Sequence, residues 1–198
     1  MQSLWMLVAA FLFAIMGVCV KLASQWYSTG EIVFYRGLIG VLVTLAIVLA
    51  QRGQLATRYP VQHTWRGVIG VTALWLWFYA FGQIPLATAT TLNNMAPIWL
   101  AAIMFGMVWW RGQSRFAWGL ALAIALSAVG VFLLLKPSFH ADQWLGITAG
   151  LFSGAISALA YLQVRRLGRL GEPEYRVVFY FSLVSMVVGF FSALIKQP

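Results

Sequence analysis

The feature that most constrains this chain is a succession of long apolar segments, separated by short connections that hold most of its charge. A bilayer core of roughly 30 Å is crossed by about 20 apolar residues in an α-helix, and the sequence contains seven segments of about that length. They cover residues 4–23, 31–50, 66–83, 86–109, 116–135, 144–164 and 175–195. Short connections make consecutive helices antiparallel neighbours. We therefore predict an all-α membrane protein, an antiparallel bundle of about seven transmembrane helices.

Composition argues against a water-soluble domain. Of the 198 residues, 62% are apolar and only 9% are charged, whereas soluble domains contain about 25% charged residues. A net charge of +9 would suggest nucleic acid as the partner of a soluble protein. Here the basic residues lie in gaps between apolar segments, which is the pattern of membrane orientation. We therefore expect a lipid bilayer and no nucleic acid as the partner.

The distribution of arginine predicts the orientation in the membrane. Lys and Arg in short loops are retained on the cytoplasmic side, and the second, fourth and sixth connections carry most of the basic residues. These are Arg52, Arg58, Arg66, Arg111, Arg115, Arg165, Arg166, Arg169 and Arg176. The opposite side holds little beyond Lys136 and Lys196. The N-terminus is predicted to be cytoplasmic, and seven spans then place the C-terminus outside.

Two stripes of small residues predict close helix packing. Small side chains let helix backbones approach each other in lipid. One stripe recurs every four residues in segment 144–164, and a second runs along segment 116–135. They consist of Gly146, Gly150, Gly154 and Ala158, and of Gly119, Ala123 and Ser127.

A faint internal repeat relates the first two segments to the last two. The tripeptide at 33–35 recurs at 178–180, and Trp5 and Phe13 match Trp144 and Phe152 at equal spacing. Five spans separate the copies, so the copies have opposite orientations in the membrane. The sequence therefore predicts an inverted repeat, a common arrangement in secondary transporters.

The fourth segment contains a polar stretch, TTLNNMAP at 90–97, within an apolar span. Pro97 has no N–H, so the carbonyl of Asn93 loses its helical partner and the helix is predicted to bend. Thr90, Asn93, Asn94 and Pro97 fall on one helical face by their spacing. One interpretation is a proline kink whose Asn side chains bond to neighbouring helices. The other is a substrate-facing polar patch near the middle of the membrane.

Three charged residues lie within or at the edge of predicted spans, where ionisable groups are costly and often functional. Lys21 ends the first segment and can extend toward the interface. Glu31 begins the second segment, and Arg36 lies one to two turns deeper. Lys21 and Glu31 are candidates for a charge pair or for coupling. Arg36 either pairs with Glu31 or a helix carbonyl, or lines a cavity that attracts an anionic or zwitterionic solute.

Aromatic residues are dense in the third segment, where Trp75 and Tyr79 share a face. Such rings can stack on a ligand or a cation. Near a helix end they more often anchor the helix at the membrane interface. Both interpretations remain open from sequence.

Signatures of catalysis are missing from the sequence. It contains no HExxH, no Gly-rich phosphate loop and no paired carboxylates within a span. His63 and His140 lie in predicted connections, and Cys19 is the only cysteine. We therefore expect no enzymatic activity, no cofactor and no metal site.

Several local motifs resemble those of a known family. They are PLATATTL at 85–92, Ala96-Pro97, Gly130-Val131 and Lys136-Pro137, and with them the chain resembles the EamA-type domain of the drug/metabolite transporter superfamily. Arg36 and Pro97 are similar to family positions. The resemblance implies ten helices in two inverted five-helix repeats around a central cavity. It also implies an alternating-access carrier of the bacterial inner membrane, often an exporter of amino acids or other metabolites.

On this basis residues 1–140 form one five-helix repeat, and 141–198 supply two helices of a second. We expect a secondary transporter for a small metabolite. The substrate-binding candidates are Arg36, Trp75, Tyr79, Thr90, Asn93 and Asn94, with Pro97 as the helix kink. The alternative is a truncated, non-transporting helical fragment or assembly subunit, and a homodimer is a further expectation because it could complete the bundle.

Overall fold

The computed structural model describes residues 2–110, 118–135 and 143–195, and all regular secondary structure within them is α-helical. The helices are α1 (Gln2–Ala23), α2 (Thr29–Ala50), α3 (Pro60–Gln83), α4 (Leu86–Asn93), α5 (Ala96–Trp110), α6 (Trp118–Leu135), α7 (Trp144–Arg169) and α8 (Glu174–Ile195). The predicted connection residues Arg111, Arg115, Lys136 and His140 lie outside the described ranges. The predicted all-α membrane bundle is confirmed.

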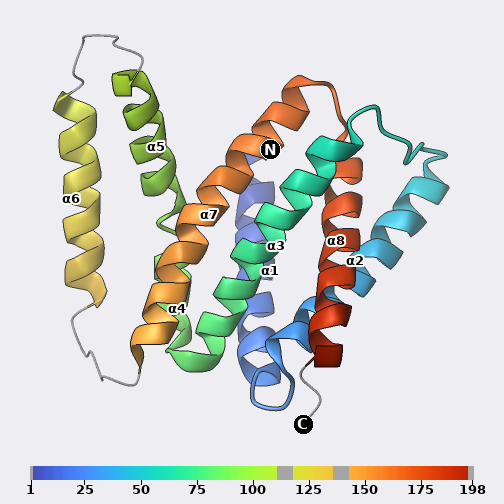
Figure 1. The fold of residues 1–198 in the computed structure, drawn as a ribbon, viewed down its shortest axis with the longest axis horizontal. Helices are drawn as coiled ribbons and strands as arrows, with labels where there is room; N and C mark the ends of the chain where they lie inside the picture. The colour runs from blue at the N-terminus through green and yellow to red at the C-terminus, as the bar shows by residue number, and fades with distance from the viewer. Residues whose placement is uncertain (1, 111–117, 136–142, 196–198) are drawn as a thin grey trace.

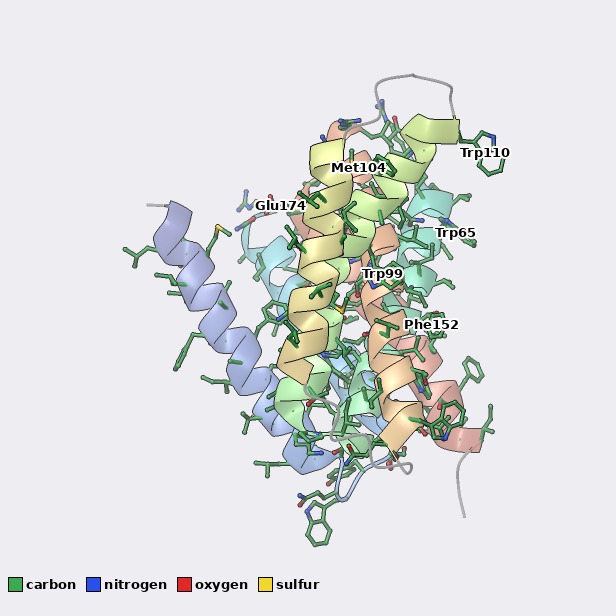
Figure 2. All side chains as sticks on the ribbon, turned by 90° about the vertical axis from the view of Figure 1, so that its left-hand side faces the viewer. Trp65, Trp99, Met104, Trp110, Phe152 and Glu174 are labelled. Carbon is green, nitrogen blue, oxygen red and sulfur yellow. The ribbon has the colours of Figure 1, made fainter. Side chains whose placement is uncertain are left out.

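Four described helices are long and apolar enough to cross a membrane by length and composition. They are Leu4–Ala23, Thr29–Ala50, Trp144–Arg169 and Glu174–Ile195. Apolar side chains cover much of their outer surface, including Leu4 on α1 and Phe152 on α7. Figure 2 shows side chains extending outward along α1 and Trp110 pointing away from the end of α5. Such a surface suits lipid as the solvent.

The helices form a flattened bundle with α5 and α6 at one edge and α2 and α8 at the other (Figure 1). Helices α3 and α7 cross the middle, and α1 and α4 lie beside them. The buried core includes Val33, Phe78, Phe81, Ile84 and Leu92. This core joins α2, α3 and α4 to the N-terminal part of α7, through Ala149.

The predicted fourth span is two helices rather than one bent helix. Helix α4 ends at Asn93 with Asn94 as its C-cap, and α5 begins at Ala96. Proline disfavours the helical conformation of the residue before it and removes a helical hydrogen bond. Pro97 therefore occupies the first turn of a new helix, where its missing N–H costs little. The helix is interrupted near Pro97, as predicted. The interruption is a complete break rather than a bend, and it precedes the proline.

Helix α3 begins earlier than the sequence pattern predicted. It starts at Pro60 rather than at Arg66, and Pro60 occupies an initiating position, as prolines commonly do. His63, predicted to lie in a connection, and Arg66, predicted at the boundary between connection and span, both lie within the helix. His63 is buried there, with 1% of its surface exposed.

Helices α2 and α8 pack antiparallel at very short range. A Cβ added to Gly37 would lie 2.8 Å from the Cα of Met186, and one added to Gly189 would lie 2.7 Å from the Cα of Phe34. These two helices contain the matching tripeptides of the predicted repeat. Their antiparallel contact is the arrangement that an inverted repeat produces, while the division into repeats at residue 140 stays a prediction.

The two predicted small-residue stripes have different outcomes. On α7, Gly150 packs on Leu92, and Gly154 packs on the backbone oxygen of Leu92. This stripe is a packing surface, as predicted. On α6, Ala123 and Ser127 are exposed and a Cβ on Gly119 would meet nothing within 4 Å. That prediction was wrong, because this face of α6 points away from the described bundle.

Candidate solute-binding cavity

A cavity of about 860 Å³ lies between α1, α2, α3, α4, α7 and α8. Its size is within the roughly 300–1,000 Å³ range of small-molecule sites. Apolar side chains form most of the wall, among them Phe13, Trp77, Phe81 and Leu86. A smaller set of polar side chains interrupts this wall, which is the usual composition of a ligand pocket. The polar set consists of Arg36, Arg66, Thr90, Thr91, Asn93, Asn94, Ser157 and Tyr161.

The break between α4 and α5 supplies part of the polar wall. The side-chain oxygen of Asn93 accepts hydrogen bonds from Ser153 Oγ at 3.1 Å and Ser157 Oγ at 3.3 Å. The backbone oxygen of Asn93 faces Gly154, and a Cβ added to that glycine would lie 3.3 Å from this oxygen. Helix α7 thus covers the carbonyl that Pro97 leaves without a helical partner. Both sequence interpretations describe part of this arrangement, since Asn93 bonds to a neighbouring helix and also lines the cavity.

The amide nitrogen of Asn93 and the whole side chain of Asn94 have no protein partner among the described residues. Thr90 donates its hydroxyl proton to the backbone oxygen of Leu86 at 2.7 Å, so its oxygen remains an acceptor. These groups lie beside the apolar wall of the cavity. They can therefore hydrogen-bond and orient a polar solute.

Two arginines face one phenylalanine in this cavity. The guanidinium carbon of Arg36 lies 5.4 Å from the ring centroid of Phe181, and that of Arg66 lies 4.8 Å from it. Arg66 Nε and Nη1 are buried and have no hydrogen-bond partner in the described chain. The sequence analysis named Arg36 but placed Arg66 at the boundary between a cytoplasmic connection and a span. Pro60 was the signal that could have placed Arg66 inside a helix.

Lys21 and Glu31 have separate structural roles. Lys21 Nζ donates hydrogen bonds to the backbone oxygens of Phe81, at 2.5 Å, and Ile84, at 3.1 Å. A cation there satisfies carbonyls at the end of α3 and complements the helix dipole. Glu31 forms a capping box with Ser28 at the start of α2. No ion pair joins Lys21, Glu31 and Arg36 in the described structure, and a role in coupling stays a prediction.

Trp75 and Tyr79 are partly buried on α3 but do not line the cavity. The α3 residues that line it are two positions away, on a different stripe, and include Trp77 and Phe81. Pro97 is exposed at the start of α5. The structure thus brings Arg36, Thr90, Asn93 and Asn94 together, and the substrate role of all six candidates stays a prediction.

A second polar cluster joins α3 to the turn between α7 and α8. Glu172 accepts hydrogen bonds from Thr57 at 2.9 Å and Arg176 at 3.4 Å, and it lies 3.1 Å from His63 Nε2. Burial raises the pKa of Glu172, but the hydrogen bonds from Thr57, His63 and Arg176 lower it, and the net pKa lies below its ordinary value. The ring of His63 packs against that of Tyr180 in a tilted arrangement, with the ring centroids 4.8 Å apart. Sequence reasoning missed this cluster.

The described residues contain no group of three or more His, Cys, Asp or Glu side chains that could hold a metal ion. The side chains that line the cavity are suited to hydrogen bonding and to charge interactions.

Comparison with known proteins places the chain in a family. The EamA-like transporter family matches residues 1–136. The chain is 32% identical over 183 residues to the pseudopaline exporter CntI of Pseudomonas aeruginosa, covering 91% of this chain and 62% of that protein. It is 27% identical over 195 residues to an uncharacterized transporter of Helicobacter pylori, covering 97% and 64%.

A more distant relative is the S-adenosylmethionine uptake transporter of Rickettsia prowazekii, 21% identical over 186 residues, with 93% of this chain and 61% of that protein covered. The chain thus spans less than two thirds of the length of these relatives. No solved structure matches it at a comparable level of significance. The match over residues 1–136 shows that the chain belongs to the EamA-like transporter family.

Proposed function

We propose that this protein acts as a secondary carrier that exports a small polar or amphipathic metabolite across the bacterial inner membrane by alternating access. The observation that carries the proposal is the cavity at the α4–α5 break. Broken helices at cavities are a recurring feature of secondary transporters, because irregular backbone within a membrane must face protein or water. Family membership supports transport, and the exporter among the relatives supports the outward direction.

The polar groups of the cavity support solute recognition. Asn94 is exposed, lines the cavity and has no partner among the described residues. An amide in that state can donate and accept hydrogen bonds to a solute without first breaking a bond to the protein. The apolar wall beside it supplies contact area for the rest of the molecule.

A two-step experiment tests the proposal. A metabolite panel is first screened for thermal stabilisation of the purified protein, since a bound solute stabilises the state that holds it. Each hit is then followed as labelled solute in proteoliposomes. We expect Asn94→Leu to weaken binding by about tenfold, because one lost solute hydrogen bond is worth about 1–1.5 kcal/mol.

Gln51→Leu is the matched control, because Gln51 is an exposed amide outside the cavity. We expect this variant to bind and transport as the wild type does. The proposal fails if no solute stabilises the protein, if the hits bind without flux, or if Asn94→Leu leaves binding and flux unchanged for every hit.

A further inference from the structure

The charges in the cavity are all of one sign. Arg36 on α2 and Arg66 on α3 both line it, and both guanidinium groups face Phe181 of α8. Both guanidinium carbons lie within 5.4 Å of the same ring centroid, at 5.4 Å for Arg36 and 4.8 Å for Arg66. A cation gains less from contact with an aromatic face than the burial of an ion costs. The ring alone does not account for two arginines here.

No carboxylate offsets these charges among the described residues. The chain has four acidic residues, and none of the three that the structure describes lines the cavity. Glu31 caps α2, Glu172 is engaged by Thr57, His63 and Arg176, and Glu174 lies at the start of α8. The fourth, Asp142, lies outside the described residues.

The unused hydrogen-bonding groups of the cavity are mainly donors. Arg66 Nε and Nη1 and Trp77 Nε1 are buried without a partner in the described chain, and all belong to lining residues. The side-chain oxygen of Asn93 already accepts from two serines. The buried unpartnered oxygens of Gln62 and Gln163 do not belong to the lining. A ligand that satisfies this set must bring acceptors.

Gly70 makes room for the arginine beside the ring. A Cβ at Gly70 would lie 3.1 Å from Arg66 Cζ and 2.9 Å from Phe181 Cε2, and it would overlap Arg66 Nη1. Any larger residue at this position would displace the guanidinium from its place against the ring. The position of Arg66 in the cavity therefore depends on this glycine.

We infer that the cavity binds the anionic group of its solute, a carboxylate or a phosphate, between Arg36 and Arg66 beside Phe181. The inference rests on the proposed function and adds the class of substrate. Arginine binds both groups with paired N–H donors. The burial of Arg66 Nε and Nη1 strengthens these charged hydrogen bonds. The remaining part of the solute lies toward the apolar wall and the amides of α4.

Matched probes test the inference on the wild-type protein in an uncharged detergent. Succinate, citrate, glutamate and inorganic phosphate are each titrated at millimolar concentration in thermal-shift assays, with the neutral isostere succinamide as the control. We expect at least one anion to raise the unfolding midpoint and succinamide to have no effect. Equal shifts from succinate and succinamide, or none from any anion, would overturn the inference.

Variants locate the bound anion. Arg36→Gln and Arg66→Gln should each weaken anion binding at least tenfold, and Gly70→Ala should weaken it by displacing Arg66. Arg165→Gln, at an exposed arginine outside the cavity, should bind within twofold of the wild type. If a Gln variant does not fold, Arg36→Lys and Arg66→Lys keep the charge but lose the paired donors, and an unchanged affinity in both would contradict the geometry.

Two outcomes separate this inference from its alternatives. If neutral or cationic metabolites bind in an Asn94-dependent way and anions do not, the proposed function stands and the anionic class is wrong. If only anionic phospholipid stabilises the protein through Arg36 and Arg66, the bound group belongs to a lipid, and the inference of an anionic solute is wrong.

Discussion

The contact between α2 and α8 makes a sharp prediction for Gly37→Ala. An added Cβ would lie 2.8 Å from Met186 Cα and 2.9 Å from Ser182 O, and it would overlap Met186 N. All three atoms belong to the α8 backbone, so no side chain can rotate away to make room. The two helices must therefore separate for the variant to fold.

The size of the effect follows from the separation required. The helices must move apart by about 0.5–1 Å to restore ordinary van der Waals contact. Each affected atom pair then loses a quarter to a half of its dispersion attraction. Overpacking of this kind costs about 1–3 kcal/mol, and alanine returns up to about 1 kcal/mol through its helix propensity. The net loss of about 1–2 kcal/mol corresponds to about 2–8 °C in a chain of this size.

The assay is thermal unfolding of the purified protein in detergent, compared at one scan rate because the unfolding of membrane proteins is often irreversible. Gly106→Ala is the matched control, since a Cβ at Gly106 of α5 would meet nothing within 4 Å. We expect its midpoint to equal or slightly exceed that of the wild type. The reasoning is refuted if Gly37→Ala is as stable as Gly106→Ala.

Two further predictions concern groups at the ends of helices. The lowered pKa of Glu172 means that its carboxylate stabilises the fold above the ordinary value of about 4.5, and that this contribution is lost as the pH falls through the folded pKa. At pH values below 4.5 the thermal unfolding midpoint should therefore decrease, and this decrease should be smaller in Glu172→Gln. Equal decreases in the wild type and the variant would contradict the stabilising role of the cluster. Lys21→Met should lower the free energy of unfolding by about 1–2 kcal/mol, because the backbone oxygens of Phe81 and Ile84 lose their donor. Lys21→Arg should keep most of that stability, and equal losses in both variants would contradict the assigned bonds.

Local chemistry explains what the sequence could predict. Apolar segments of bilayer length form helices wherever they occur, and a proline interrupts its own helix, so the break near Pro97 follows from a few adjacent residues. Arg36 was recognisable because a charge deep in an apolar segment requires a polar environment. Arg36 lines one cavity together with Thr90, Asn93 and Asn94. The last three were expected to lie together because their spacing places them on one helix face.

The contacts between residues far apart in the sequence could not be predicted, because they depend on which helices pack together. Phe181 reaches the cavity from α8, far along the chain from Arg36, and His63 meets Glu172 across 109 residues. No local pattern encodes such pairings. The aromatic cluster of α3 gives another example, because the density of rings around Trp75 and Tyr79 says nothing about which stripe faces inward. Helix α3 packs mainly against α7 and α8, and the stripe that contains Trp77 lines the cavity instead.

The bond between Lys21 and the end of α3 has a mechanical consequence for α1. Residues 10–18 of α1 supply five positions of the cavity wall, while Leu4 and Trp5 near its N-terminal end are largely exposed. Anchored at Lys21, the helix is a lever whose other end, at Leu4, is about 25 Å away at 1.5 Å per residue. A tilt of about 10° about that pivot displaces the far end by roughly 4 Å, about the width of a carboxylate. The lysine thus ties this wall of the cavity to the end of α3 at a single point.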